Sequence, residues 1–329
     1  MREPLRLVMM GTGSFAAPLF RALYATRHQV LALVTQPRRD ARPGAECGVN
    51  LLREIAAEHG TTVFDPESVN TDASREVLRQ LLPDLFIVAD YGQILSAETL
   101  AVARLGGLNL HGSLLPKYRG AAPINWAIYH GDAETGVTVI HMTPRVDAGP
   151  TLGQAHTPID PEETAVELER RLADMGAPLL VQVIDEMIAG RTPPLPQDPS
   201  QASPARRLRK SDGAIDWSRT AVAIRNQIRA LEPWPRTHTF WQRPNGAPVR
   251  LILGRSAIVE GGRGAATAGT VLVAGPEFVV ATGSGGLQIL EVQPAGKRML
   301  GAAEFLRGYP VKTGEQFGPA EGGRMKDEG

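Results

Sequence analysis

The sequence predicts two domains, an α/β domain built on a Rossmann-like open twisted parallel sheet and a small β-barrel that follows it. In residues 1–190, apolar strand-like segments alternate with helical segments, which is typical of parallel sheets. Residues 191–207 are rich in proline and indicate a semi-rigid linker. After the linker, short strands separated by glycine turns favour a barrel over residues 208–313. The length of 329 residues is sufficient for two cores.

The composition is that of a globular protein without a disulfide framework. Hydrophobic residues make up 43% of the chain, and Cys47 is its one cysteine. The sequence has neither the His-Glu-x-x-His nor the Cys-x-x-Cys pattern of common metal sites, so we expect no metal. The apolar segment 5–10 is too short to span a membrane. We therefore expect a cytoplasmic protein, and we expect it to be a monomer.

The charges are unevenly distributed although they cancel overall. Residues 1–204 hold 17 Lys and Arg against 24 Asp and Glu, whereas residues 205–329 hold 18 against 11. A basic second domain suggests an anionic partner. A solvated surface with a chance imbalance is the alternative interpretation.

The first strand, residues 5–10, leads into the glycine turn Gly11-Thr-Gly-Ser-Phe-Ala16 and a helix. This turn matches the fingerprint of dinucleotide-binding folds. The next strand, residues 29–35, ends at Gln36 instead of the carboxylate that would bind an NAD ribose. An NADP-binding dehydrogenase stays open as an alternative, but any first βα unit of this fold needs such a turn.

A basic loop and a possible ligand-binding edge follow. The loop of residues 38–48 contains Arg38, Arg39 and Arg42, which either bind an anion or form a solvated surface. The strand of residues 85–89 places Tyr91 just beyond its carboxyl end, where ligands bind in open α/β sheets. Tyr91 is either a ligand contact or a packed aromatic residue.

An amide, an imidazole and a carboxylate form the predicted catalytic set. Asn109 and His111 lie at the end of a strand, and residues two apart in a strand point to the same side. Asp147 lies in a loop after the strand-like run 137–142. Together these groups can stabilise an oxyanion and transfer protons.

The motifs around this set resemble those of the folate-dependent formyltransferases. They are Asn109-x-His111-x-Ser-Leu-Leu-Pro116, Arg-Gly-Ala-Ala-Pro at 119–123, Gly-Asp-x-Glu-Thr-Gly-Val-Thr at 131–138, and Asp-Ala-Gly at 147–149. The resemblance extends from about residue 5 to about residue 310 and is strongest to the members that act on methionyl-tRNA. One departure is Pro150, which stands where many members have an acidic residue.

The resemblance implies a reaction and a role for each residue of the set. The formyl donor would be 10-formyltetrahydrofolate, and the acceptor would be the amino group of initiator methionyl-tRNA. Asn109 would donate to the oxyanion, His111 would stabilise it and assist proton transfer, and Asp147 would orient His111 and favour its charged form. The predicted folate-binding residues are Ser113, Leu114, Leu115 and Pro116, through their backbone groups, and Tyr91.

The resemblance also implies that the second domain is an OB-type barrel that holds tRNA. Cations where the linker meets the barrel are candidate phosphate contacts, and the basic loop is a candidate contact of the tRNA acceptor end. The candidates are Arg206, Arg207, Arg209 and Lys210, together with Arg38, Arg39 and Arg42. Residues 314–329, rich in glycine and charge, predict a disordered tail.

Two further alternatives stay open. A formyltransferase that acts on a nucleotide-sugar amine would share the Asn-x-His-x-Ser-Leu-Leu-Pro motif but would not need a basic nucleic-acid surface. An RNA-binding protein with an inactive formyltransferase fold is the non-enzymatic alternative, and the intact set of Asn109, His111 and Asp147 argues against it.

Overall fold

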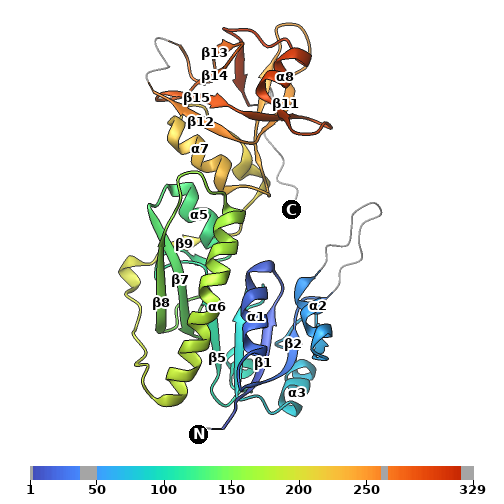
Figure 1. Ribbon diagram of the computed structural model, residues 1–329, viewed down its shortest axis with the longest axis vertical. Coiled ribbons are helices and arrows are strands. Elements are labelled where there is room, and N and C mark those ends of the chain that lie inside the picture. Colours follow the sequence, from blue (N-terminus) through green and yellow to red (C-terminus); the bar gives the residue numbers. More distant parts are fainter. Residues whose placement is uncertain (1–2, 38–49, 261–265, 320–329) are drawn as a thin grey trace. The chain divides into compact units, whose positions relative to one another are not determined.

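The computed structural model describes residues 3–37, 50–260 and 266–319, which divide into two compact units. The first unit comprises Met1–Ile124, Ala133–Ile159 and Glu167–Arg206. The second comprises Asn125–Asp132, Asp160–Val166 and Arg207–Gly329. Each unit has its own β-sheets (Figure 1).

The described part of the first unit is built on one seven-stranded sheet with the order β3-β2-β1-β4-β5-β7-β8. Its strands are β1 Arg6–Gly11, β2 Gln29–Val34, β3 Thr62–Phe64, β4 Leu85–Ala89, β5 Gly107–His111, β7 Glu134–His141 and β8 Thr151–Pro158. The first five strands in this order are parallel, but β7 runs antiparallel to both of its neighbours, β5 and β8. The prediction of a wholly parallel sheet was therefore wrong at the β5–β7 and β7–β8 pairs, and the Rossmann-like sheet is mixed. The loop of residues 142–150 is too short for the crossover that parallel neighbours require.

The central strands explain why a Rossmann-like sheet was predictable. Strand β4 reads Leu-Phe-Ile-Val-Ala and is buried throughout, as expected for a parallel strand covered on both faces. The strand order reverses between β1 and β4, because β1 leads on to β2 and β3 whereas β4 leads on to β5. Ligands of open α/β sheets bind outside the carboxyl ends of strands at such a switch point.

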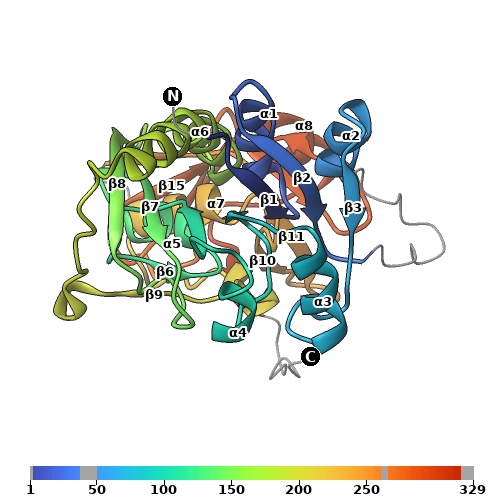
Figure 2. The same cartoon turned by 90° about the horizontal axis from the view of Figure 1, so that it is seen from below.

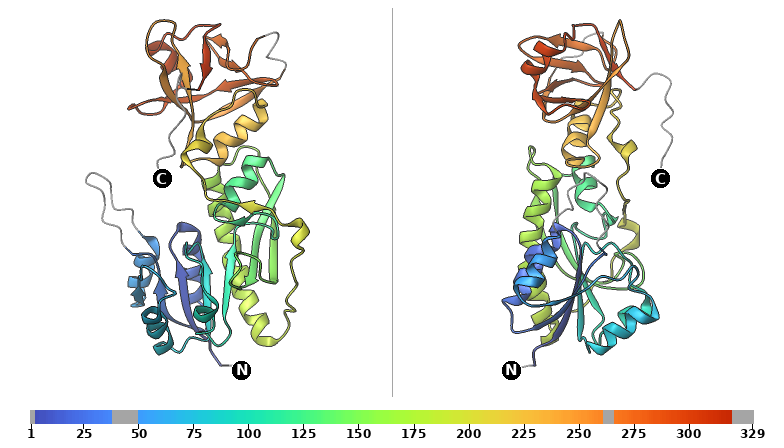
Figure 3. Two further views of the ribbon diagram at one scale, coloured as in Figure 1. Left: turned by 180° about the vertical axis from the view of Figure 1, so that it is seen from behind. Right: turned by 90° about the vertical axis from the view of Figure 1, so that its right-hand side faces the viewer.

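Helices cover both faces of this sheet (Figures 2 and 3). Helices α1 and α6 lie on one face, and α2 packs beside α1. Helices α3 and α4 lie on the other face, where Leu78 and Leu100 join a core cluster with residues of β1 and β4. Asn50, Thr71 and Ser96 cap α2, α3 and α4 by accepting from backbone N–H groups, which sets where these helices begin. The bounds are η1 Ser14–Ala16, α1 Ala17–Tyr24, α2 Leu51–Glu58, α3 Asp72–Gln80, α4 Ala97–Leu100 and α6 Ala165–Ala189.

The proline-rich segment is bonded to the first unit. Leu195 and Thr151 exchange backbone hydrogen bonds of 2.8 and 2.9 Å. After η2 (Pro199–Gln201), the strand β9 (Pro204–Ala205) pairs with β6 (Arg119–Gly120). Gly120 has a φ of +124°, and a Cβ there would lie 2.6 Å from the carbonyl oxygen of Ala205, so this pairing requires glycine. The boundary between the units falls after Arg206, close to the predicted end of the linker.

The second unit contains two antiparallel sheets around one core. The order of its five-stranded sheet is β17-β16-β11-β10-β18, and that of its four-stranded sheet is β12-β15-β14-β13. A bridge between Thr270 and Gln316 links the two sheets, in keeping with the predicted small barrel. Its elements are α5 Pro123–His130, η3 Lys210–Gly213, α7 Ala221–Ala230, β10 Thr237–Gln242, β11 Val249–Leu253, β12 Ser256–Val259, β13 Val271–Ala274, β14 Phe278–Ala281, β15 Gly286–Ile289, β16 Glu291–Pro294, β17 Leu300–Gly301, α8 Ala302–Gly308 and β18 Gln316–Gly318.

Two stretches from the predicted first domain group with the second unit. Asn125 Nδ2 donates to the carbonyl of Ala230 at 2.7 Å, which ties most of α5 to the end of α7. Arg229 donates to the carbonyls of Asp160 and Glu163 at 3.1 and 2.7 Å. These contacts explain why the second unit includes residues 125–132 and 160–166.

The predicted disorder from residue 314 is corrected by β18. This strand pairs with β10, and Phe317 at its centre is 1% exposed in the core of the second unit. Just before it, Glu315 accepts from Trp241 Nε1 at 2.7 Å. Strand pairing, the buried Phe317 and the bond of Glu315 thus hold residues 315–318, although their glycine and charge content suggested a tail. Residues 320–329 lie outside the described residues.

Candidate active site

Asn109, His111 and Asp147 come together in the first unit. Asn109 and His111 are the third and fifth residues of β5, and Asp147 lies in the loop between β7 and β8. Asn109 Nδ2 donates to Asp147 Oδ1 at 3.1 Å, and His111 Nδ1 lies 3.6 Å from Asp147 Oδ2. One carboxylate thus contacts both side chains that the strand presents on one side.

The His111 ring is held at both nitrogens. Its side chain is buried, and Nε2 lies 2.8 Å from the carbonyl oxygen of Tyr118. Because a carbonyl only accepts, Nε2 carries a hydrogen. A neutral imidazole then presents an unprotonated Nδ1 towards Asp147, and a charged imidazolium presents an N–H donor there. In either form, Nδ1 is the ring nitrogen that faces Asp147.

The carboxylate of Asp147 is fixed by two donors. Besides the amide of Asn109, the backbone N–H of Gly120 donates to Oδ2 at 2.9 Å. Asp147 itself has a φ of +47°, a left-handed conformation that aspartate tolerates better than most residues. The backbone of Asp147 and the β6 segment together determine where the carboxylate lies.

The backbone of residues 113–116 is largely satisfied by the protein itself. Thr138 Oγ1 donates to the carbonyl of Ser113 at 2.7 Å and accepts from the N–H of Leu115 at 3.0 Å. Gln154 Nε2 donates to the carbonyl of Leu115 at 2.8 Å. These bonds pre-order the loop but occupy groups that the sequence assigned to folate. The partly exposed Leu114 and Pro116 are the members of this set best presented to a ligand.

The ring of Tyr91 packs in the core. The residue is 2% exposed and lies in the cluster on the α3–α4 side of the sheet. Burial raises the pKa of the Tyr91 hydroxyl, which has no hydrogen-bond partner among the described residues. Its carbonyl oxygen accepts from Thr12 Oγ1 and Gln36 Nε2, each at 3.2 Å. The structure thus favours the packed-aromatic interpretation over a ligand contact by the side chain.

Asp90 lies against the first glycine turn. A Cβ at Gly13 would be 1.8 Å from Asp90 Oδ2, so the carboxylate occupies the space over the turn. Although much of the residue is exposed, burial of this carboxylate and the nearby Glu169 raise the pKa of Asp90 to about 6. A pyrophosphate bound at this turn would meet a negative charge at neutral pH. This arrangement argues against the dinucleotide-binding alternative.

The predicted tRNA-contacting cations fall into two groups. Arg38, Arg39 and Arg42 lie outside the described residues. Arg206, Arg207, Arg209 and Lys210 are exposed; Arg206 ends the first unit and the other three belong to the second.

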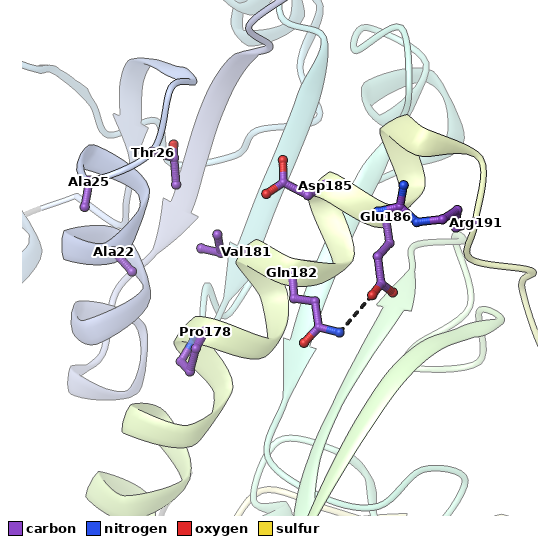
Figure 4. Close-up of a pocket in the computed structure, with 9 residues that line it drawn as sticks. All are labelled: Ala22, Ala25, Thr26, Pro178, Val181, Gln182, Asp185, Glu186 and Arg191. Carbon is purple, nitrogen blue, oxygen red and sulfur yellow. Dashed lines mark hydrogen bonds between the residues drawn. The ribbon is translucent and has the colours of Figure 1, made fainter. Parts of the chain in front are cut away.

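A surface groove of about 560 Å³ lies between α1 and α6, away from the predicted site residues (Figure 4). Its polar groups come mainly from α6, where Gln182 Nε2 donates to Glu186 Oε1 at 2.8 Å. None of the predicted site residues lines it. Within residues 3–37, 50–260 and 266–319, no group of three or more His, Cys, Asp or Glu could hold a metal, and no helix is long and apolar enough to cross a membrane.

Sequence reasoning missed the side chains that support the loops next to Asn109, His111 and Asp147. Thr138, Gln154 and Gln197 each bond backbone groups of these loops. Thr138 and Gln154 sit opposite each other on β7 and β8, so strand pairing could have indicated that they act together. Gln197 lies in the proline-rich segment, where no local pattern marks it.

The chain matches two family models in succession. The model described as formyl transferase matches residues 5–184, and the one described as formyl transferase, C-terminal domain, matches residues 207–310. The chain is 42% identical over 317 residues to a methionyl-tRNA formyltransferase of Trichlorobacter lovleyi, covering 96% of this chain and 98% of that protein. It is 40% identical over 314 residues to a protein of the same name from Methylococcus capsulatus, covering 95% and 100%.

Solved structures share the fold at low identity. One is an N-formyltransferase from Helicobacter canadensis in complex with folinic acid and dTDP-3-aminofucose, with a TM-score of 0.63, 19% identity and coverage of 88% of this chain and 99% of that one. Another is HypX from Aquifex aeolicus in complex with tetrahydrofolic acid, with a TM-score of 0.60, 17% identity, and coverage of 99% of this chain and half of HypX. With both domain models matched in order and relatives of about 40% identity along nearly the whole length, the chain belongs to the formyl transferase family.

Proposed function

We propose that this protein transfers the formyl group of 10-formyltetrahydrofolate to the amino group of initiator methionyl-tRNA. The observation that carries the proposal is identity of 40–42%, over both domains, to proteins named methionyl-tRNA formyltransferase. The clustered Asn109, His111 and Asp147 provide groups suited to that chemistry. The folate bound in the related solved structures supports a folate donor.

The reaction would proceed through a tetrahedral intermediate. The amine attacks the formyl carbon, and the carbonyl oxygen becomes an oxyanion. The nitrogen that attacked loses a proton, and the departing N10 of the folate gains one. The amide of Asn109 has two hydrogens, and only one of them is donated to Asp147. The second is available to the oxyanion, whose charge such preorganised donors stabilise.

His111 and Asp147 would share the proton transfer. The Tyr118 carbonyl occupies Nε2, so the Nδ1 edge, which faces Asp147, is the one that can gain and lose a proton. The charged ring places a positive charge beside the intermediate, and the Asp147 carboxylate keeps that ring oriented. No residue of the protein needs to be acylated.

The acceptor is the point on which the sugar-amine alternative differs. Likeness to the sugar formyltransferases rests on identities below 20% and concerns the fold. Residues 205–313 carry 16 Lys and Arg against 7 Asp and Glu, an excess suited to a polyanionic acceptor and unnecessary for a small sugar. Both observations support methionyl-tRNA.

The decisive experiment is transfer of labelled formyl from 10-formyltetrahydrofolate to charged initiator tRNA. The expected result is rapid labelling of methionyl-tRNA and no labelling of the uncharged tRNA. A dTDP-amino sugar is assayed in parallel at matched concentration. Faster labelling of the sugar than of methionyl-tRNA would replace the proposed acceptor with the alternative one.

A further inference from the structure

Gln197 joins the proline-rich segment to the loop that carries Asp147. Its Nε2 donates to the carbonyl of Asp147 at 2.8 Å and to the carbonyl of Gly149 at 2.6 Å. Its Oε1 accepts from Arg119 Nε at 3.1 Å and from a second guanidinium nitrogen of Arg119 at 2.7 Å. The side chain is partly buried although its neighbours in the segment are exposed.

This network uses every hydrogen-bonding group of the Gln197 amide. Two N–H donors meet two carbonyl acceptors, and the oxygen meets two donors from one guanidinium. The orientation of the amide follows from its partners, because carbonyls only accept and a guanidinium only donates. A glutamate would retain the contact with Arg119 but would turn an oxygen towards the two carbonyls.

The hydrogen bonds of Gln197 hold the backbone on which the Asp147 carboxylate is carried. They hold the carbonyls on both sides of Ala148, next to the left-handed backbone of Asp147. The opposite side of the network is Arg119, whose neighbour Gly120 donates to Asp147 Oδ2. Gln197 thus connects the backbone of Asp147 to the strand that holds its carboxylate.

The same segment also supports His111. Ser203 Oγ accepts from the N–H of Tyr118 at 2.9 Å, and the carbonyl of Tyr118 is the partner of His111 Nε2. The segment therefore orders both catalytic loops, and Gln197 is its contact on the Asp147 side.

We propose that Gln197 is a positioning residue for formyl transfer, which acts by holding Asp147 at its distance from Asn109 and His111. The kinetic test of this role rests on the proposed function, because it measures formyl transfer. The spectroscopic test does not, because it needs no substrate. Misplacement of a catalytic group by about 1 Å can cost on the order of 100-fold in rate. Gln197→Glu should therefore lower kcat by about 10- to 100-fold while the KM values for folate and tRNA change by less than about threefold.

The kinetic test is a double-mutant cycle on the full chain, measured in single-turnover assays. If Gln197 acts through Asp147, Gln197→Glu should lower the rate of the wild type but have little further effect in an Asp147→Asn background. Gln201→Glu is the matched control, because it makes the same change on an exposed side chain of the same segment and should retain the wild-type rate. Gln197→Ala, which introduces no charge, should behave like Gln197→Glu. Independent losses that multiply in the double variant would overturn the positioning role.

The spectroscopic test needs no acceptor. The His111 ring resonances, assigned by comparison with His111→Gln, should shift in Gln197→Glu and stay unchanged in Gln201→Glu. Unfolding temperatures of the variants are measured alongside to confirm that they fold. If the wild type does not formylate methionyl-tRNA but the resonances shift, the proposed acceptor fails and the positioning role stands. If the wild type is active and Gln197→Glu shows a normal rate and normal resonances, the positioning role fails and the function stands.

Discussion

Asn109 combines two functions in one amide, since it fixes Asp147 with one hydrogen and presents the other to the site. Its predicted place in the site follows from a local rule: residues 109 and 111 share one side of a strand. The position of Asp147 could be predicted only as a loop near the same edge. Asp147 accepts hydrogen bonds from Gly120 and Gln197, which are 27 and 50 residues away in sequence, and local patterns do not predict such partners.

The first prediction concerns this set. Asn109→Ala, His111→Ala and Asp147→Ala should each lower kcat by about 10²–10³-fold, the usual cost of one preorganised group at a developing oxyanion. The rate is measured as labelled formyl transferred to methionyl-tRNA, with circular dichroism as the check on folding. Near-normal turnover of His111→Ala would refute the mechanism.

The second prediction concerns the stability contributed by Asp90. The carboxyl has a raised pKa of about 6 in the folded protein against an ordinary value of 3.8, because the carboxylate end of this partly exposed residue loses solvent where it lies against Gly13, and because Glu169 is nearby. The folded state therefore binds its proton more tightly than the unfolded state does. This stabilisation is complete below about pH 4 and is lost as the pH rises through 6.

Asp90→Asn removes that titration. The unfolding temperature of the variant relative to the wild type should rise between about pH 4 and pH 7 and then level off. Thermal unfolding at closely spaced pH values measures this difference. Asp174→Asn, at an exposed position on α6, is the matched control. The same pH dependence in both variants would show that the effect does not come from the surroundings of Asp90.

For Tyr91, the sequence predicts the position of the residue but not the direction of its side chain. The strand of residues 85–89 correctly placed Tyr91 beyond a carboxyl end, but that position does not specify which way the ring points. The residue belongs to a core cluster with apolar residues of β1, β4 and α4, and its carbonyl accepts from Thr12 and Gln36. The direction of the Tyr91 ring depends on packing between elements, which no single segment of the sequence specifies.

At the scale of elements, the composition of the proline-rich segment does not predict its hydrogen bonds to the first unit. Proline lacks an N–H, and a run of prolines predicts an extended linker. The residues between the prolines nevertheless bond the first unit, through Leu195, Gln197 and Ser203. These hydrogen-bond partners depend on the tertiary structure. The sequence therefore predicts that the segment is extended, but it does not predict that the segment contributes to the site.

The third prediction concerns β18, a strand that the sequence analysis did not predict. Phe317 is fully enclosed in the core of the second unit, and removal of a buried phenyl group typically costs about 3–5 kcal/mol. Phe317→Ala should lower the free energy of unfolding of the second unit by about that amount, as measured by chemical denaturation of the full chain. Lys312→Ala, an exposed neighbour, should leave it within about 0.5 kcal/mol. A loss below about 1 kcal/mol for Phe317→Ala would mean that β18 does not complete this core.

For the whole molecule, the loops of the proposed active site are bonded by residues close to the domain boundary. A chain that ends near residue 200 would lack Ser203 and Ala205, which bond Tyr118 and β6. Loss of activity in such a chain would therefore not isolate the second domain's contribution to tRNA binding. Changes of exposed charge in the full chain are the better test of that contribution.

The fourth prediction applies this test to the excess of positive charge over residues 205–313. Each cation that neutralises a phosphate releases counterions, so the logarithm of the tRNA affinity should fall steeply with the logarithm of the salt concentration. Arg209 and Lys210 are exposed near the start of the second unit. The double variant Arg209→Ala/Lys210→Ala should weaken tRNA binding and reduce the salt slope by about two, about one for each phosphate that is no longer neutralised.

The control pair Arg255→Ala/Arg307→Ala removes the same charge from exposed positions elsewhere in the second unit. Its salt slope should stay close to that of the wild type, and folate binding should be unchanged in both double variants. Equal changes in the two pairs would indicate a diffuse field in place of defined contacts at residues 209–210. If tRNA binding does not depend on salt, the case for a nucleic-acid surface on this unit is removed and the sugar acceptor is favoured, because a nucleotide sugar carries only one diphosphate and needs no such extended excess of positive charge.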